Sequence, residues 1–327
     1  MPAVSADTLS LPRISPVSPT AVDRPVRSIT TGPTGFEGEG FPVRRAFAGA
    51  TYADIDPFIM MDQMGEVNYA PFEARGTDWH PHRGFETVTY IMDGTFLHQD
   101  THGGGGVITD GGTQWMTAGG GILHIETPPE ELVVKGGLFH GVQIWVNLPA
   151  RDKMIPPAYQ NIEAQQLTLF TSADAASLVR LIAGTVGEFT GPGSTHTPIT
   201  IAHASIPAGS RVVLPWQKNF NALVYVLAGH GTVGAAGARI AKGQLAVLDA
   251  RDVITLTGGG GDNESSDTME VLLLGGEPIN EPVAQYGPFV MNTREELVQA
   301  YEDFQRGRLG VVPPDGLRPY RAGSRLN

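Results

Sequence analysis

The sequence predicts an all-β chain of two duplicated barrel or sandwich domains, with one helix near the C-terminus. Three observations carry this prediction. Gly (42 residues) and Pro (25 residues) make up about one residue in five, a share typical of many strands joined by turns. Short runs of alternating or continuous apolar character recur along the chain, separated by Gly, Pro, Asn or Asp. A stretch of the first half also recurs in the second half.

The predicted organisation begins with an arm. Residues 1–25 are rich in Ser, Pro, Thr and Ala without an apolar period, so we expect them to form a flexible N-terminal arm. The segment 153–166 contains two consecutive prolines and indicates a linker. We therefore expect a first domain over residues 26–155 and a second over 156–327. The runs expected to be strands are 86–92, 132–134, 142–148, 178–182, 199–206, 223–227, 244–248 and 269–274.

The helix is predicted over about residues 293–306. Thr293 can cap it, Glu296 completes a capping box, and Gly307 can end it. Its apolar stripe consists of Leu297, Tyr301 and Phe304. We expect this stripe to pack on one of the barrels. A shorter helix is considered at 172–178.

The internal repeat aligns residues 80–94 with 215–229 without a gap, at an offset of 135 residues. Phe85 meets Phe220, and Tyr90 meets Tyr225. An offset of domain size indicates duplicated domains and not a solenoid.

Two pairs of potential metal ligands lie in the first domain. His80 and His82 are separated by one residue, and so are His124 and Glu126. Residues i and i+2 of a strand point to the same face, so each pair can aim two side chains into one cavity. Three imidazoles and a carboxylate suit a divalent transition metal.

The second domain lacks these ligands. In the repeat, the places of His80, His82 and Glu86 are taken by Pro215, Gln217 and Asn221. None of them is a good replacement ligand. We therefore expect one metal per chain, in the first domain.

The composition excludes several classes of function. The net charge of −12 argues against nucleic acid and anionic membranes as partners. The chain has no cysteine, which excludes disulfides, thiolate catalysis and Fe–S clusters. No apolar run approaches the roughly 20 residues of a membrane span, and no basic start precedes an apolar core. We expect a soluble cytoplasmic protein.

The residues around the candidate ligands resemble a known family. The run from His80 to Glu86 resembles the first cupin motif. The run from Gly119 to His124 resembles the second, although Gly119 stands where Pro is usual. Cupins are small jelly-roll barrels. Longer runs are similar to the pirin family, at 56–62, 80–90, 114–119, 121–126, 143–148 and 286–297.

The resemblance implies a bicupin with a mononuclear metal, usually iron, in the first barrel. The matching ligands are His80, His82, His124 and Glu126. Glu86, the usual cupin carboxylate, is not a ligand in pirins. Its parity with His80 and His82 would point it inward, so Glu86 and Arg83 are expected to support the ligands. Gly120 stands where pirins often have Arg, and residues 111–113 replace a common Gly-Asp.

The remaining histidines receive simpler interpretations. His98 and His102 flank or neighbour a run of four glycines, 103–106, and are interpreted as part of a mobile, solvated loop. Structural or surface roles are expected for His140, His196, His203 and His230.

Two functions remain open. In the first, a redox metal supports a quercetin 2,3-dioxygenase-like reaction between a flavonol-type small molecule and dioxygen. Glu126 then also accepts the proton of the substrate hydroxyl. In the second, a metal-dependent, redox-responsive protein regulates partner proteins without turnover. Fe(II) is the first expectation for the metal, with Mn, Ni, Cu and Zn as alternatives. A structural zinc is disfavoured, because such sites often use Cys.

Overall fold

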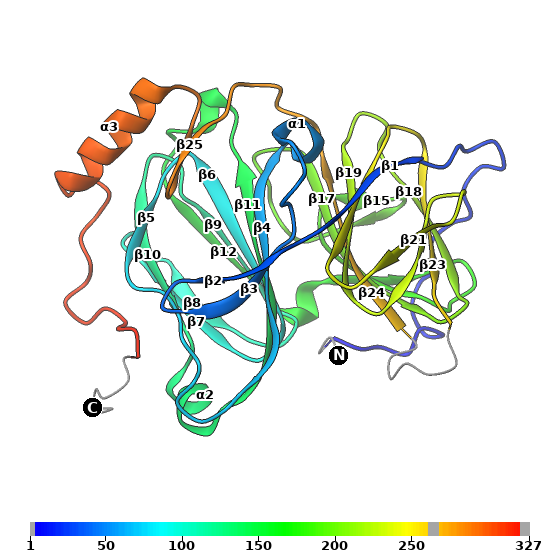
Figure 1. Ribbon diagram of the computed structural model, residues 1–327, viewed down its shortest axis with the longest axis horizontal. Helices are drawn as coiled ribbons and strands as arrows, with labels where there is room; N and C mark the ends of the chain where they lie inside the picture. The colour runs from blue at the N-terminus through cyan, green and yellow to red at the C-terminus, as the bar shows by residue number, and fades with distance from the viewer. Residues whose placement is uncertain (1–3, 261–267, 321–327) are drawn as a thin grey trace.

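Two β-barrels lie side by side in the computed structural model, which describes residues 4–260 and 268–320 (Figure 1). The predicted all-β fold with a C-terminal helix is therefore confirmed. Residues 1–3 of the expected arm, and 261–267 and 321–327 of the expected second domain, lie outside the described residues.

The first barrel consists of two antiparallel sheets. The order of the seven-stranded sheet is β12 (Ala158–Ile162), β9 (Thr113–Thr117), β6 (Phe85–Asp93), β11 (Gly137–Asn147), β4 (Phe58–Tyr69), β3 (Phe41–Arg45) and β2 (Thr34–Glu37). The order of the four-stranded sheet is β5 (His80–His82), β10 (Ile122–Thr127), β7 (Phe96–Asp100) and β8 (Gly105–Ile108).

The second barrel repeats this plan. Its seven-stranded sheet is β1 (Val26–Thr31), β22 (Gln244–Leu248), β19 (Ala222–Ala228), β24 (Thr268–Gly276), β17 (Ile199–Pro207), β14 (Leu178–Ala183) and β13 (Thr168–Thr171). Its four-stranded sheet is β18 (Arg211–Pro215), β23 (Val253–Gly258), β20 (His230–Val233) and β21 (Ala238–Ala241).

The repeat seen in the sequence sets equivalent strands in equivalent places. β6 and β19 are both third in their sheets, next to β11 and β24. By the same order, β1 occupies in the second barrel the edge that β12 occupies in the first. Figure 1 shows β1 (blue) crossing from the second barrel towards β2 of the first. Each barrel thus takes one edge strand from the range expected for the other domain: β1 lies within 26–155 and β12 within 156–327.

The segment expected to be a flexible arm lies along the second barrel. Ile14 is buried in the apolar core of that barrel. Arg24 is also buried, and its guanidinium donates to the carbonyl oxygens of Gln217 (2.6 Å) and Phe220 (3.0 Å). An isolated apolar residue and a buried cation have no periodicity, so the sequence pattern could not indicate this packing. The domain limits stay a prediction.

The two seven-stranded sheets pack face to face. One buried apolar cluster includes Val88 and Ile144 of the first barrel with Ile201 and Leu272 of the second. Sheets that pack in this way bury the side chains of alternate residues on their facing surfaces.

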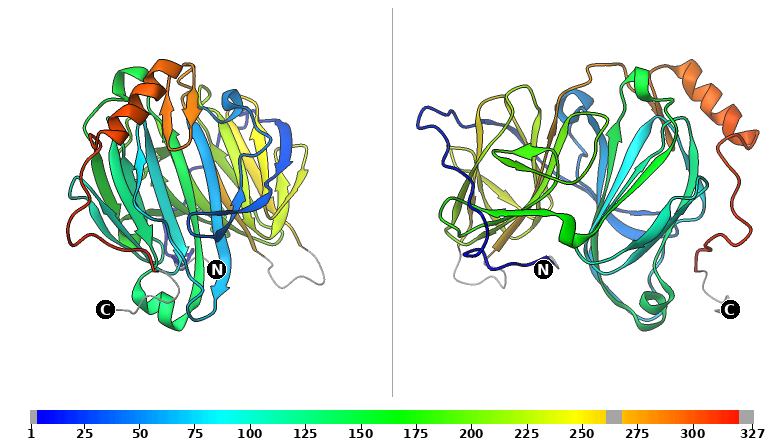
Figure 2. Two further views of the ribbon diagram at one scale, coloured as in Figure 1. Left: turned by 60° about the vertical axis from the view of Figure 1, so that its left-hand side comes forward. Right: turned by 180° about the vertical axis from the view of Figure 1, so that it is seen from behind.

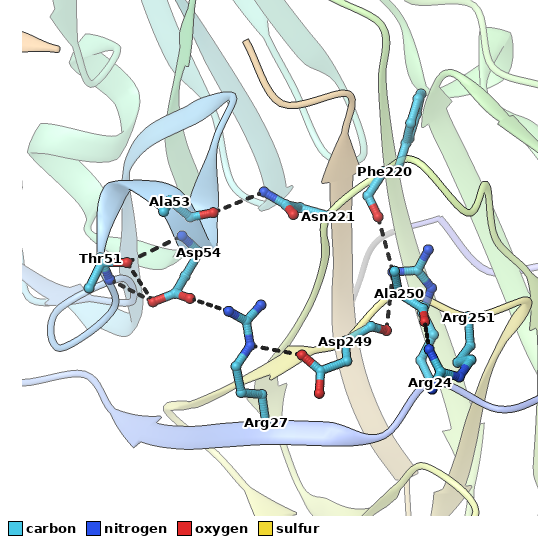
Figure 3. A network of polar contacts seen from close by, with 10 residues as sticks. All are labelled: Arg24, Arg27, Thr51, Ala53, Asp54, Phe220, Asn221, Asp249, Ala250 and Arg251. Atoms are coloured by element: carbon cyan, nitrogen blue, oxygen red, sulfur yellow. Dashed lines mark hydrogen bonds and ion pairs between the residues drawn. The ribbon is translucent and has the colours of Figure 1, made fainter. Parts of the chain in front are cut away.

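A polar network reinforces the contact between the barrels (Figure 3). Arg27 of β1 donates to Asp54 (2.8 Å) of the short helix α1 (Tyr52–Ile55) and pairs with Asp249 (3.0 Å). Asn221 donates to the carbonyl oxygens of Asp56 (2.7 Å) and Ala53 (3.2 Å). Asn221 is the counterpart of Glu86 in the repeat, and in the second barrel this position contacts the backbone of the first barrel.

All but one of the predicted strands are present. The prediction of a strand at 132–134 is wrong, because these residues lie in helix α2 (Glu130–Lys135). Pro129 precedes this helix and two glutamates occupy its first turn, which favours helix initiation. The short helix considered at 172–178 is absent, since Ser172 and its neighbours form a turn before β14. Its Oγ accepts from the N–H of Ser177, a local bond that competes with helix.

The remaining short elements lie outside the four large sheets. They are η1 (Ala150–Asp152), η2 (Ala164–Gln166), β15 (Thr185–Val186), β16 (Phe189–Thr190), β25 (Ala284–Tyr286) and β26 (Phe289–Met291).

The predicted C-terminal helix is α3 (Arg294–Gln305). Thr293 and Glu296 form the expected capping box, and Gly307 follows with φ of 68°. Leu297 and Tyr301 pack against the first barrel together with Phe289, whereas Phe304 is partly exposed. Figure 2 shows α3 on the side of the first barrel that is remote from the second. None of the described helices is long and apolar enough to cross a membrane.

Candidate metal centre

Three histidines converge inside the first barrel. β5 pairs antiparallel with β10, which sets His80 opposite His124. The ring centroids of His80 and His124 are 4.3 Å apart, and that of His82 lies 4.8 Å from each of them. One ligating atom of each histidine lies within 4.8 Å of the others. The cluster is therefore capable of binding a metal.

The hydrogen bonds of these rings leave lone pairs free. His80 Nδ1 lies 2.8 Å from the carbonyl oxygen of Asp78, and His82 Nδ1 lies 3.2 Å from that of Pro288. A carbonyl only accepts, so each Nδ1 carries the hydrogen and each Nε2 carries a lone pair. His124 Nε2 is buried without a hydrogen-bond partner among the described residues. This donor set fits a metal.

The charge states of the rings also fit. Burial lowers the pKa of His80, and burial followed by the neighbouring His80 lowers those of His82 and His124 well below the usual value. All three shifts favour the neutral imidazole. Metal binding requires unprotonated histidines.

Glu126 lies two residues beyond His124 on the same face of β10. Its Oε1 accepts from the Thr89 hydroxyl (2.8 Å). The ligating atom of Glu126 groups within 4.8 Å with those of His124 and His98. The structure therefore contains two overlapping groups of potential ligands that share His124.

The interpretation of His98 as part of a solvated loop is wrong. His98 is 2% exposed and lies on β7, opposite Glu126 on β10. His98 and Asp100 are separated by one residue, as are His80 and His82 and also His124 and Glu126. This spacing was the feature of the sequence that could have indicated a buried His98. The glycines that follow obscured it. His102, by contrast, is exposed.

Glu86 does not face the histidine cluster. It lies on β6 with Val88 and Tyr90, on the face that packs against the second barrel, and its Oε1 accepts from Thr117 (2.7 Å). The parity expected from His80 and His82 fails because Gly84, with φ of 89°, interrupts the alternation between β5 and β6. Glu86 therefore points away from the ligands that it was expected to support.

Arg83 points towards the C-terminal helix. Its Nη1 lies 3.0 Å from Asp303 Oδ2, and its Nε donates to the carbonyl oxygen of Gly120 (2.7 Å). It links α3 to the loop before His124. Its support of the ligands is indirect.

The C-terminal segment completes the surroundings of His82. Pro288 supplies the acceptor for His82 Nδ1. Lys153 is buried, and its Nζ donates to the carbonyl oxygens of Gly84 (2.8 Å) and Val290 (3.0 Å). Burial lowers the pKa of Lys153 to about 8. Residues far apart in the sequence thus fix the end of β5.

A cavity of about 640 Å³ reaches the cluster. The apolar part of its wall includes Phe41, Met60, Phe96 and Trp145. Its polar part includes Glu37, Glu39, Arg45, Asp62, Asp78, Glu126 and Gln143, together with His80 and His82. Burial raises the pKa of Asp62 to about 6, although Arg45 Nη1 lies 3.7 Å from its Oδ2.

The other histidines lie away from the cluster. His140 and His203 are buried between the barrels, and His196 is exposed. These places agree with the expected structural or surface roles.

Comparison with family models gives two matches. The model described as Pirin matches residues 40–146, and the model described as Pirin C-terminal cupin domain matches residues 201–310. The two matched ranges fall on the first and the second barrel.

Individual relatives agree with these models. A Pseudomonas aeruginosa protein, provisionally named a quercetin 2,3-dioxygenase, is 41% identical over 83% of this chain and 93% of its own length. A pirin-like protein of Arabidopsis thaliana is 40% identical over 84% of this chain and 86% of its own length.

Solved structures agree as well. The crystal structure of quercetin 2,3-dioxygenase from Acinetobacter baumannii has a TM-score of 0.80 at 36% identity, and the match covers 88% of this chain and 98% of that chain. A bacterial pirin from Escherichia coli in complex with nickel(II) shares the fold, with a TM-score of 0.55 at 21% identity over 77% of this chain and 100% of that chain.

Proposed function

The chain belongs to the pirin family, and from this membership we propose that it is a metal-dependent dioxygenase acting on flavonol-like, quercetin-type substrates. The observation that carries the proposal is the cavity of about 640 Å³ that reaches His80, His82 and Glu126. An enzyme needs such access, whereas a structural metal site is usually closed.

The ligands in this proposal are His80, His82, His124 and Glu126, holding one divalent metal per chain. Fe(II) is the first choice, with Mn, Ni, Cu or Zn as alternatives. When bound, the metal supplies Lewis-acid and redox chemistry for a reaction between an enediol-like substrate and dioxygen.

Glu126 is the proposed proton acceptor. The single hydroxyl hydrogen of Thr89 has two acceptors within reach, Oε1 of Glu126 at 2.8 Å and Oε1 of Gln143 at 2.5 Å, and it holds the Glu126 oxygen in place when it is donated there. Oε2 is then the oxygen that takes the proton of the substrate hydroxyl. Positioned general bases act within hydrogen-bond reach of the proton that they remove.

The cavity wall supports an aromatic, uncharged substrate. Trp145, Met60 and Phe41 give flat and flexible apolar contacts. Among the described lining residues, several carboxylates face one guanidinium, that of Arg45. An excess of carboxylates repels anionic ligands and accepts hydrogen bonds from phenolic hydroxyls.

A regulatory role through partner proteins is the second candidate. The observation that favours it is the link between the surface helix α3 and the ligand strand β5, made by Arg83 and Asp303. A partner that moved α3 would act on the neighbour of His82.

Oxygen consumption tests the proposal. Protein purified without a metal-affinity resin is analysed for metal and then loaded with Fe(II) in the absence of oxygen. Uptake of dioxygen on addition of quercetin, absent in the metal-free protein, is the expected result. If no flavonol turns over with Fe, Mn, Ni or Cu, the regulatory function is the better one.

A further inference from the structure

We propose that His98 and Asp100 form a positioning pair, which fixes the tautomer and the orientation of His124. The inference rests on the proposed function, because it takes His124 to be a metal ligand. It assigns a role to two side chains that the ligand set does not include.

The strand register brings the pair to the centre. β7 runs antiparallel to β10, with Asp100 opposite His124 and His98 opposite Glu126. Residues two apart share one face of a strand. His98 and Asp100 are 2% and 3% exposed. Both side chains are therefore inside the barrel beside the ligands of β10.

The hydrogen bond between the two histidines has one possible direction if His124 binds a metal. His98 Nδ1 and His124 Nδ1 are 3.3 Å apart, and only one of the two nitrogens can carry the shared hydrogen. A hydrogen on His124 Nε2 would block the metal and would face no acceptor among the described residues. His124 therefore donates from Nδ1 and keeps its Nε2 lone pair.

The same reasoning places the hydrogen of His98. The one lone pair of its Nδ1 is shared by two donors, Nδ1–H of His124 and Nε2–H of Gln114. Its own hydrogen is then on Nε2, which lies 3.7 Å from Asp100 Oδ2. This separation is longer than a hydrogen bond, so the Asp100 carboxylate acts on the Nε2–H of His98 by electrostatic attraction, while His98 Nδ1 accepts from His124.

The backbone after β7 holds Asp100 in place. Asp100 Oδ1 accepts from the N–H groups of His102 (2.7 Å) and Gly104 (2.9 Å). A Cβ on Gly104 would collide with the carboxylate of Asp100. The glycine run thus lets the backbone fold closely onto Asp100, a role that its sequence did not reveal.

Tyr159 of β12 fixes the ring of His98. The two rings stack with centroids 5.3 Å apart and an angle of 20° between their planes. With Gln114 and His124 at its edge, His98 has no free rotation. An imidazole that donates Nδ1–H to a fixed acceptor is a better metal ligand through Nε2.

The experiment compares His98→Ala, His98→Gln and Asp100→Asn with the wild type and with His102→Ala, a matched control at an exposed neighbouring histidine. Co(II) is the probe. Its affinity is measured by competition with a chromophoric chelator, its stoichiometry by elemental analysis, and its coordination by the visible absorption spectrum.

We expect His98→Ala to keep one Co(II) per chain, with a changed spectrum and an affinity roughly 10- to 100-fold lower. His98→Gln should recover part of this loss, because its carbonyl oxygen can accept from His124 Nδ1. Asp100→Asn should weaken binding in the same direction. His102→Ala should match the wild type.

Two results would overturn the inference. Wild-type affinity and spectrum in His98→Ala would mean that the pair does not act on His124. Loss of stoichiometric Co(II) from folded His98→Ala, with Asp100→Asn unchanged, would make His98 a ligand. If His98→Ala fails to fold by circular dichroism, His98→Gln and Asp100→Asn decide.

The results can contradict the proposed function without contradicting the role of His98 and Asp100. A wild type that binds Co(II), and whose affinity depends on His98 as stated, but that turns over no flavonol when Fe-loaded, contradicts the dioxygenase only. A wild type without any metal affinity contradicts both.

Discussion

Tyr90 and Tyr225 hold equivalent places in the two barrels, and each hydroxyl reaches across the interface to the other barrel. The Tyr90 hydroxyl lies 3.0 Å from His203 Nδ1, and the Tyr225 hydroxyl donates to Gln63 Oε1 at 2.8 Å. Gln63 and His203 are also equivalent. In the first barrel Val142 pairs with both Tyr90 and Gln63, and in the second barrel Leu272 pairs with both Tyr225 and His203. The duplication has kept the tyrosines while their partners diverged.

Removing either hydroxyl should destabilise the protein. Tyr90→Phe leaves His203 Nδ1 without this partner, and Tyr225→Phe does the same to Gln63 Oε1. We expect each change to lower the free energy of unfolding by about 1–3 kcal/mol, the usual cost of a buried group left unsatisfied. Urea denaturation measures it, with the exposed Tyr286→Phe as control. A loss no larger than in the control would mean that the crossing is not stabilising.

The protein should become less stable as the pH is lowered, and His140 should account for part of this loss. Burial, and next the nearby His203, lower the pKa of His140 to about 3. Below the unfolded pKa of about 6.5, the unfolded chain binds a proton that the folded chain does not. Stability from this group is therefore complete above pH 6.5 and lost at up to roughly 1.4 kcal/mol per pH unit below it.

The measurement is the difference in unfolding free energy between wild type and His140→Gln from about pH 5 to pH 8. His203 and the clustered histidines titrate in both proteins, so the difference isolates His140. The expected result is a wild-type advantage that shrinks as the pH falls. Parallel profiles would exclude His140 as the cause.

Metal should bind in the first barrel only. Pro215, Gln217 and Asn221 offer no replacement for the ligands, so elemental analysis should find one tightly bound equivalent per chain. His82→Ala or His124→Ala should remove most of it and leave the β circular-dichroism signal largely unchanged, whereas His196→Ala should retain it. Two tight equivalents would contradict the prediction. Unfolding of the ligand variants would make the site structural.

Glu126→Gln separates ligation from base catalysis. Glutamine still offers a carbonyl oxygen to a metal but cannot take a proton. If Glu126 is the base, flavonol-dependent oxygen uptake should fall about 10²–10⁴-fold, with the metal content retained. Activity and metal lost in proportion would leave Glu126 as a ligand only.

The C-terminal helix should be needed for solubility. Truncation after Met291 removes Leu297 and Tyr301 from Phe289 and takes Asp303 from the buried Arg83. We expect the shortened chain to be less soluble and to unfold at lower temperature, because apolar surface is exposed and a buried cation loses its partner. Thermal melts and sedimentation compare it with the full chain. Equal behaviour would show that α3 is dispensable.

The local parts of this fold could be predicted because their signals are local. Thr293, Glu296 and Gly307 lie within one helix, and the alternation at 86–92 lies within one strand. The pairing of β1 with β22 could not be predicted in this way, since a strand's sequence states which face is buried but not which strand lies beside it.

The candidate site shows the same division. The spacing of His80 with His82 and of His124 with Glu126 identified the converging histidines. Glu86 was misplaced because Gly84 breaks the period on which the inference depended. Pro288 and Tyr159 could not be found, since their contacts with His82 and His98 join segments that only the tertiary fold brings together.

The placement of β1 in the second barrel sets an order for biosynthesis. Every strand of the first barrel's two sheets has been made once the ribosome passes Ile162. β1 emerges earlier but finds its partner only when β22 is complete at Leu248. At typical rates of about 5–20 residues per second, β1 waits roughly 10–40 s as an unpaired edge. The charged Arg27 and the polar Ser28, Thr30 and Thr31 of this strand then disfavour pairing with the same strand of another nascent chain.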